Sequence, residues 1–286
     1  MVSELEFYAS PGEMTDIGGL GEGTPASVSE LCAMVQGLVM HPFWTQAYGV
    51  AADEAEVVAL QIRREAELQL RPAQDILAKA LEIDPSPLAQ ARPPERRVLG
   101  NCRDFSTVTT AFLRYHGVPA RARCGFGTYF APNLYIDHWV VEWWDGERWV
   151  RTDAQLDALQ RAALNIDFDV LDMPRGAFVD GGEGWQLFRS GEAKAEQFGV
   201  LNMFGIGFVR GNLERDIAAL NKVEMLAWDG WDNESKLDEP TLDELAKIAF
   251  TGDFAAARTV YETDDRVRVP DEITVFFPEE HRVRIR

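Results

Sequence analysis

The stretch GNCRDFSTVTTAFLRYHGVPARARCGF, residues 100–126, predicts a helix that is followed by a strand. Between Cys102 and Tyr115 the apolar side chains lie three or four residues apart, which is the spacing of one helix face. Gly117, with Val-Pro directly after it, ends such a helix. Small, charged and apolar residues then alternate as far as Phe126, which is typical of a strand.

The next informative stretch, HWVVEWWDGERWVRTD at residues 138–153, predicts two antiparallel strands joined at Asp145-Gly146. Asp-Gly between apolar runs is the strongest short hairpin signal in a sequence. If these two residues form the whole loop, Trp144 pairs with Glu147, and the register of the hairpin follows from that pair.

On this register His138 stands directly opposite Asp153. Opposed side chains have Cβ atoms about 4.5–5.5 Å apart, which is close enough for a carboxylate to accept a hydrogen bond from an imidazole. We expect the pair to behave as the base and the orienting acid of a catalytic triad. The expectation depends on the register, because a slip by one residue would place the two side chains on opposite faces.

Cys102 follows Gly100-Asn101 and opens the predicted helix. A helix N-terminus carries about half a positive charge, which favours a thiolate over a thiol. A nearby imidazolium would lower the pKa of the thiol further and give the ion pair of a cysteine hydrolase. Backbone N–H groups at such a terminus have no helical partner, so we expect them to hold the oxyanion of a tetrahedral intermediate.

Helical patterns flank this region on both sides. Ser27 and Glu30 form a capping box ahead of an apolar stripe, so a helix is expected from there to His41-Pro42. Further helices are expected at 51–70, 73–83, 212–226, 241–250 and 254–261. The Gly-rich residues 175–210 are expected to be loops, and a strand is expected at 272–277.

Composition excludes several classes of function. The formal charge of −19 would repel the phosphates of nucleic acid, so no nucleic-acid partner is expected. There is no run of 18 apolar residues, and the first fourteen residues hold no Lys or Arg, so we expect neither a membrane helix nor a secretory signal. The three cysteines, without a CxxC pair, fit a reducing cytoplasm, and we expect no metal or other cofactor.

Four short motifs, taken in order, resemble the core of the transglutaminase-like superfamily: GNCRDF at 100–105, GVPAR at 117–121, DHW at 137–139 and WVRTD at 149–153. In that family a Cys at a helix start, a His on a strand and an Asp on the next strand form the triad. The resemblance therefore implies that Cys102 is the nucleophile, His138 the base and Asp153 the acid. Arg103-Asp104 stands where animal transglutaminases have Trp, which is nearer to the bacterial and archaeal members, and we expect a bacterial stand-alone protein.

The resemblance also implies an α+β fold with a papain-like core and helical flanking regions. In such a core the helix that begins at the cysteine packs on an antiparallel sheet. We expect residues 1–95 to form an N-terminal helical region packed on this core and residues 96–160 to form the catalytic core. Residues 161–286 are expected to be a mostly helical extension of the same domain.

The remaining Cys, His and Trp residues have simpler interpretations. We expect core positions for Cys32, Cys124, Trp139 and Trp143. His41 precedes a proline at a helix end, His116 lies at a helix C-terminus, and His281 lies in the tail, so none of them has an opposed carboxylate.

The function implied by the resemblance is acyl transfer through an acyl-enzyme on Cys102, with a peptide, amide or acyl-thioester substrate. We expect a peptidase or amidase-type hydrolase. The alternatives are an acyltransferase that passes the acyl group to an amine, and an inactive module that only binds peptides. A zinc site built from Cys102, Cys124, His116 and His138 is disfavoured, because the sequence has neither CxxC nor HxxxH spacing.

Overall fold

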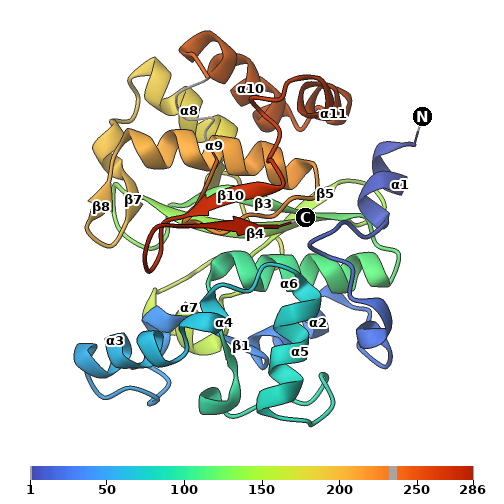
Figure 1. Cartoon of the computed structure of the whole chain (residues 1–286), viewed down its shortest axis with the longest axis vertical. Coiled ribbons are helices and arrows are strands. Elements are labelled where there is room, and N and C mark those ends of the chain that lie inside the picture. Colours follow the sequence, from blue (N-terminus) through green and yellow to red (C-terminus); the bar gives the residue numbers. More distant parts are fainter. Residues whose placement is uncertain (1, 232–236, 286) are drawn as a thin grey trace. The chain divides into compact units, whose positions relative to one another are not determined.

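The structure is a computed structural model that describes residues 2–231 and 237–285 (Figure 1). The chain forms two compact units, and each unit consists of two segments. The first unit contains Met1–Ala122 and Val140–Met173, and the second contains Arg123–Trp139 and Pro174–Arg286. Helices occur together with mixed sheets, so the fold is α+β, as predicted.

The first unit is mainly helical. Its helices are α1 (Glu4–Ala9), α2 (Val28–Gln36), α3 (Glu54–Arg63), α4 (Glu65–Leu68), α5 (Ala73–Ile83), α6 (Cys102–Tyr115) and α7 (Ala158–Ala163). Short 3-10 turns are η1 (Gly18–Gly21), η2 (Pro42–Trp44) and η3 (Pro94–Arg96). Its strands are β1 (Val39–Met40), β2 (Val98–Leu99) and β5 (Trp149–Thr152), together with parts of β3 (Ala120–Gly127) and β4 (Tyr135–Trp144).

Helix α6 is the centre of the first unit's core, where it packs on α2 and α5 (Figure 1). The buried apolar side chains at these contacts include Leu31, Val35, Leu77, Val108 and Phe112. Each such side chain stabilises the fold by about 1.5–3 kcal/mol relative to an exposed one. The predicted bounds of α5 and α6 are confirmed.

Two helices near the N-terminus are shorter than predicted. Helix α2 ends at Gln36, because Gly37 caps it, and Val39–Met40 form a strand instead of a last helical turn. The single helix expected at 51–70 is two helices, α3 and α4, which are separated at Arg64. Arg64 leaves the helical region with a φ of −114° and a ψ of 20°.

Strands β4 and β5 form the predicted antiparallel hairpin, but the predicted register is wrong. Trp144 pairs with Trp149 rather than with Glu147, because the loop has four residues instead of two. The Asp145 N–H donates to Arg148 O at 3.1 Å. Asp145 Oδ1 accepts hydrogen bonds from the N–H groups of Glu147 and Arg148, both at 2.8 Å, and this side chain selects the longer loop.

The corrected register changes the expectation for His138 and Asp153. The last pair of the β4–β5 ladder is Val141 with Thr152, so Asp153 lies beyond the end of β5 and is not part of an opposed strand pair. The predicted direct opposition of His138 and Asp153 is therefore wrong. Because side chains alternate with a period of two, a shift of two residues leaves each strand side chain on the face that was predicted for it.

The second unit combines the outer strands of the large sheet with further helices. Its helices are α8 (Gly181–Ser190), α9 (Ile206–Leu220), α10 (Glu239–Thr251) and α11 (Phe254–Thr263), with the 3-10 turn η4 (Ala195–Gln197). Its strands are β6 (Phe178–Asp180), β7 (Phe198–Val200), β8 (Met203–Phe204), β9 (Asp229–Gly230), β10 (Glu272–Val275) and β11 (His281–Arg284). The strand order of the large sheet is β6-β3-β4-β7-β8, with β5 paired to β4, and a smaller sheet has the order β11-β10-β9.

The prediction that residues 175–210 are loops is wrong, because this range contains α8 and three strands. Two of its glycines, Gly181 and Gly182, serve close helix packing rather than turns. A Cβ at Gly181 would lie 2.5 Å from Asn212 O in α9, and a Cβ at Gly182 would lie 2.4 Å from Ala246 O in α10. Figure 1 shows α8 beside α9 and α10. Helix α9 also begins and ends six residues earlier than predicted.

Candidate active site

Cys102 is the first residue of α6, and two hydrogen bonds fix the segment that leads to it. Strands β1 and β2 pair in parallel, and just beyond them the Gly100 N–H donates to Met40 O at 3.1 Å. The Leu99 N–H donates to Glu67 Oε2 at 2.8 Å. The direction in which the chain enters the helix is therefore set before Cys102.

A reciprocal cap fixes the start of α6. Asn101 Oδ1 accepts from the Arg103 N–H at 2.9 Å, and the Asn101 N–H donates to Asp104 Oδ2 at 2.8 Å. The Asn101 side chain also accepts from the Asp104 N–H, which completes a capping box. A Cβ at position 100 would lie 2.9 Å from Asp104 Oδ2, so a larger residue there would displace this carboxylate from the cap.

The cap engages two of the backbone N–H groups at this helix terminus, a group of donors that we expect to hold the oxyanion. The N–H groups of Arg103 and Asp104 both donate to Asn101. These two amides are therefore engaged in holding the helix start. Cys102 itself is 9% exposed.

An ion pair lies in the first turn of α6, directly after the cysteine. Arg103 Nη1 is 3.1 Å from Asp104 Oδ1, and the two residues are 1% and 2% exposed. Burial raises the pKa of the Asp104 carboxyl, and the charges of Arg103 and Arg71 oppose this rise. Breaking a buried pair of this kind costs much more than breaking an exposed one, so the first turn is strongly anchored.

Asp153 is fully buried in the first unit. Its N–H donates to Val170 O at 2.8 Å, and its Oδ1 accepts from the Gln155 N–H at 2.9 Å. The neighbouring Ala154 O accepts from Gln36 Nε2 at 3.1 Å, which ties the loop to α2. The loop that carries the predicted triad acid is thus held by backbone and side-chain bonds, and the carboxylate itself accepts a backbone N–H.

His138 lies on β4 in the part of the strand that belongs to the second unit, and it is 2% exposed. Two aromatic rings pack against it edge-on. The ring centroid of Phe130 is 4.9 Å from that of His138, and the centroid of Tyr129 is 6.0 Å away. These rings exclude water from one side of the imidazole.

Asp137, next to His138, is a half-buried residue whose carboxyl the sequence did not single out. Burial raises its pKa, whereas Arg215, Asn212 and His138 act to lower it. Asn212 Nδ2 donates to Asp137 Oδ1 and to Gly125 O, both at 2.8 Å. Asn212 lies in α9, 75 residues further along the chain, so no local pattern could have indicated this contact.

Residues 50–154 match the model of a protein family described as the Transglutaminase-like superfamily. The matched range contains Cys102, His138 and Asp153. This segment is transglutaminase-like. A search of curated proteins and a search of solved structures each returned no match.

The transglutaminase-like segment fits a papain-like core, with α6 beginning at the cysteine and the antiparallel β4–β5 hairpin further along the chain. The superfamily suggests a cysteine-based enzyme. The family match begins well before the four motifs recognised in the sequence, so it also includes α3, α4 and α5.

The other cysteines are buried outside the transglutaminase-like motifs, as predicted. Burial raises the pKa of Cys32 to about 12, and the nearby charge of Asp153 acts in the same direction. Cys124 is fully buried in β3, and its N–H donates to Asp216 Oδ1 at 3.0 Å. Trp139 is likewise buried, and Trp143 packs against the core of the first unit, as predicted.

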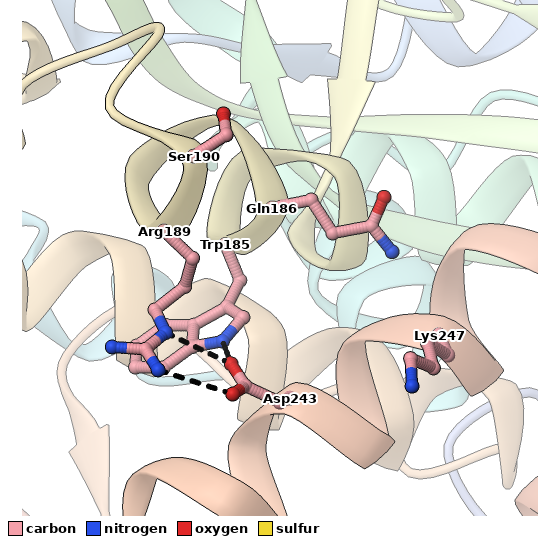
Figure 2. Close-up of a pocket in the computed structure, with 6 residues that line it drawn as sticks. All are labelled: Trp185, Gln186, Arg189, Ser190, Asp243 and Lys247. Atoms are coloured by element: carbon pink, nitrogen blue, oxygen red, sulfur yellow. Dashed lines mark hydrogen bonds and ion pairs between the residues drawn. The ribbon is translucent and has the colours of Figure 1, made fainter.

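A surface depression between α8 and α10 contains none of the predicted site residues (Figure 2). Asp243 Oδ1 accepts hydrogen bonds there from Trp185 Nε1 at 2.7 Å and from Arg189 Nε at 3.0 Å. Figure 2 shows these three side chains turned toward one another, with Lys247 to one side. Trp185 and Arg189 of α8 donate to Asp243 of α10, so we interpret these side chains as a contact that joins the two helices.

Two further observations concern the described parts of the chain. Across residues 2–231 and 237–285, no group of three or more His, Cys, Asp or Glu side chains is arranged to hold a metal ion. In the same ranges no helix is both long enough and apolar enough to cross a membrane.

Proposed function

We propose that this protein is a cysteine hydrolase that forms an acyl-enzyme on Cys102 from an amide or thioester substrate. His138 acts as general base and general acid, and Asp153 holds its imidazole in the productive tautomer and orientation. The acyl group is released to water, which makes the activity that of a peptidase or amidase.

The first half of the reaction forms the acyl-enzyme. The Cys102 thiolate attacks the carbonyl carbon, and the carbonyl electron pair moves to oxygen to give a tetrahedral oxyanion. The C–N or C–S bond then breaks, and the imidazolium of His138 donates its proton to the leaving amine or thiolate. The products of this half are a free amine or thiol and a thioester on Cys102.

The second half returns the enzyme to its starting state. His138 takes a proton from water as the oxygen attacks the thioester carbonyl. The C–S bond breaks, a carboxylic acid is released, and the Cys102 thiolate forms again. An amine in place of the water would give a new amide, which is the acyltransferase alternative.

The observation that carries the proposal is the position of Cys102 at the first residue of α6. The positive end of a helix favours a thiolate, and the thiol pKa falls further beside an imidazolium. The Asn101 cap and the Arg103–Asp104 pair hold this helix start in one conformation. The match of residues 50–154 to a superfamily of cysteine enzymes supports the same function.

The proposal is tested by trapping the acyl-enzyme. The protein is mixed with a panel of aryl thioesters and peptide p-nitroanilides, and intact mass is recorded within the first turnovers. We expect an acyl adduct that maps to the Cys102 peptide, and no adduct in Cys102→Ala. Cys124→Ala is the matched control, because it removes a buried cysteine outside the proposed triad. Turnover of the same substrates by Cys102→Ala at the wild-type rate would refute the proposal.

A second measurement tests the pairing of Cys102 with His138. The reagent 1,3-dibromoacetone alkylates a reactive thiolate and then an imidazole within reach, with loss of both bromides. We expect a bridge between the Cys102 and His138 peptides in the wild type, and a singly attached bromoacetonyl group in His138→Ala. A bridge from Cys102 to any other residue would contradict the assignment of the base.

Added amines separate the hydrolase from the acyltransferase. Glycinamide at increasing concentration competes with water for the acyl-enzyme, and the ratio of amide to acid product measures which acceptor the site prefers. We expect acid to predominate.

A further inference from the structure

A chain of hydrogen bonds begins two residues after Asp153 and ends on another carboxylate. Gln155 Nε2 donates to Gln160 Oε1 at 3.1 Å. Gln160 Nε2 donates to the Tyr48 hydroxyl at 3.0 Å, and this hydroxyl donates to Asp157 Oδ2 at 2.6 Å. The chain connects the loop after β5 with the segment between η2 and α3.

The direction of every bond in this chain follows from its last member. A carboxylate accepts hydrogen bonds and cannot donate them, so the Tyr48 hydroxyl must donate to Asp157. Burial raises the pKa of Tyr48 to about 12, and the bond to Asp157 acts in the same direction, so the donor proton is retained. The oxygen of Tyr48 then accepts from Gln160, and the oxygen of Gln160 accepts from Gln155.

This order also fixes the side-chain amide of Gln155. Its NH₂ group is the donor end of the chain and faces Gln160, so its oxygen faces the other way and takes no part in the chain. Gln155 is buried, and within the described residues its Oε1 has no hydrogen-bond partner. A buried acceptor without a partner is unfavourable, and an apolar side chain of the same length would avoid it. The amide therefore serves the chain rather than packing.

Two further hydrogen bonds connect the chain to the two ends of the loop 153–157. The Gln155 N–H donates to Asp153 Oδ1 at 2.9 Å, so the residue at the start of the chain also touches the carboxylate. At the other end, Asp157 Oδ1 accepts from the Gln160 N–H at 2.9 Å and caps helix α7. The loop 153–157 is thus held at both ends.

We propose that Gln155, Gln160 and Tyr48 are positioning residues that fix the orientation of the Asp153 carboxylate through this chain. The inference rests on the proposed function, in which Asp153 orients the base. Loss of a chain member frees the loop 153–157, and the base is then held less firmly beside the nucleophile. The imidazolium stabilises the Cys102 thiolate less well in consequence.

The experiment measures thiolate formation without any substrate. The rate of alkylation of Cys102 by iodoacetamide is followed against pH by mass spectrometry of its peptide, in the wild type and in Tyr48→Phe. We expect the apparent pKa of Cys102 in Tyr48→Phe to rise toward the ordinary thiol value of about 8.5. A rise of about 0.5 unit would slow alkylation about threefold at acidic pH.

Tyr261→Phe is the matched control. Tyr261 is a buried tyrosine of the second unit, and its hydroxyl accepts from the Val269 N–H at 3.2 Å. The control loses a tyrosine hydroxyl that accepts a hydrogen bond, as Tyr48→Phe does, but we expect its alkylation profile to match the wild type. Melting temperatures of both variants show that they remain folded.

A second variant tests whether the residues act as one chain. Gln155→Leu breaks the chain at its other end, and we expect a similar rise in the apparent pKa of Cys102. The double variant should show no more than the larger single shift, because both changes interrupt the same chain, whereas independent effects would add.

A wild-type profile in Tyr48→Phe, together with a shifted profile in Asp153→Ala, would overturn the positioning role and leave the triad standing. Additive shifts in the double variant would also overturn it. An unchanged profile in Asp153→Ala would overturn the proposed triad and the positioning role together, so this one variant separates the two failures.

Discussion

Trp144 pairs with Trp149 across the β4–β5 hairpin, and their ring centroids are 5.8 Å apart. This aromatic pair closes the loop of four residues at the start of the strand that leads to Asp153. Aromatic pairs of this kind add stability beyond the area that they bury.

The stability of the loop between Trp144 and Trp149 depends on the charge of Asp145. Hydrogen bonds from the N–H groups of Arg148 and Glu147 hold the pKa of this carboxyl below its usual value of 3.8. A lowered folded-state pKa contributes stability above the unfolded value, and that stability is lost as pH falls through the folded value. We therefore expect Asp145→Ala to be less stable than the wild type at pH 7, with a smaller difference below pH 3.8.

Urea unfolding between pH 7 and acid measures this difference. Asp145→Asn is the matched control, because its amide oxygen still accepts both hydrogen bonds but does not titrate. At pH 7 the free energy of unfolding of Asp145→Asn should lie between those of the wild type and Asp145→Ala. A difference between wild type and Asp145→Ala that grows in acid would contradict the role of the carboxylate.

Asp104 is predicted to be the residue of the first turn of α6 on which folding depends most. Asp104→Ala removes the carboxylate 3.1 Å from buried Arg103 and half of the capping box, so we expect a loss of about 3–5 kcal/mol in unfolding free energy. Glu82→Ala is the control, because it removes one partner of the more exposed Lys79–Glu82 pair and should cost less than about 1 kcal/mol. Equal effects in chemical denaturation would show that the Arg103–Asp104 pair is not the anchor.

Cysteine labelling should be selective and should remain so at alkaline pH. With limiting iodoacetamide at about pH 6, we expect Cys102 to react well before Cys32 and Cys124, because only a thiolate reacts. Since the pKa of Cys32 is about 12, raising the pH to about 9 should still leave it unlabelled. Peptide mass spectrometry reports each site, and labelling in urea shows that all three thiols can react. Equal rates in the folded protein would contradict the assignment of Cys102 as the activated thiol.

Asp153→Ala should abolish most of the turnover while the protein remains folded. Removal of the orienting acid of a triad lowers kcat by about 10⁴-fold. Asp172→Ala, which removes an exposed carboxylate paired with Arg148, is the control and should retain the wild-type kcat. Steady-state kinetics on the substrate found by acyl-enzyme trapping gives both values. A reduction of only a few fold in Asp153→Ala would exclude an orienting role.

Glycine in α8 should be irreplaceable where the helices touch. A Cβ at Gly182 would meet Ala246 O at 2.4 Å and Phe250 N at 2.7 Å, and backbone atoms cannot move aside as a flexible side chain can. We expect Gly182→Ala to destabilise the protein by about 1–3 kcal/mol. Gly207→Ala in α9 meets nothing within 4 Å and should stabilise it by up to about 1 kcal/mol. Thermal unfolding of the two variants gives opposite signs if the contact is as described.

The parts of the fold that were predicted correctly are those with local causes. Helix α6 begins and ends where predicted, because its first residue follows a capping Asn101 and its end is followed by Gly117. The bounds of α5 follow in the same way from apolar periodicity within eleven residues. Both signals are contained in the stretch that they describe.

The features that were predicted wrongly depend on contacts between residues far apart in the sequence, or on which hydrogen bonds a side chain forms. Gly181 and Gly182 of α8 predict loops when read alone, and only the backbones of α9 and α10 explain them. The hairpin register depended on whether Asp145 would bond two N–H groups of its own loop, which the Asp-Gly pair does not reveal. The hydrogen-bond chain from Gln155 to Tyr48 joins residues that precede and follow α6 in the sequence, more than 100 positions apart, so local periodicity does not indicate it.

The chain passes from one compact unit to the other after Ala122, after Trp139 and after Met173. The matched family segment therefore takes residues from both units, because 123–139 lies inside it. A single recombination event within the coding sequence cannot transfer either unit intact, and neither can be removed by trimming one end of the chain. We therefore expect the two units to occur together in relatives. Those that keep the Cys102 motif are expected to keep counterparts of α8 and α9 as well.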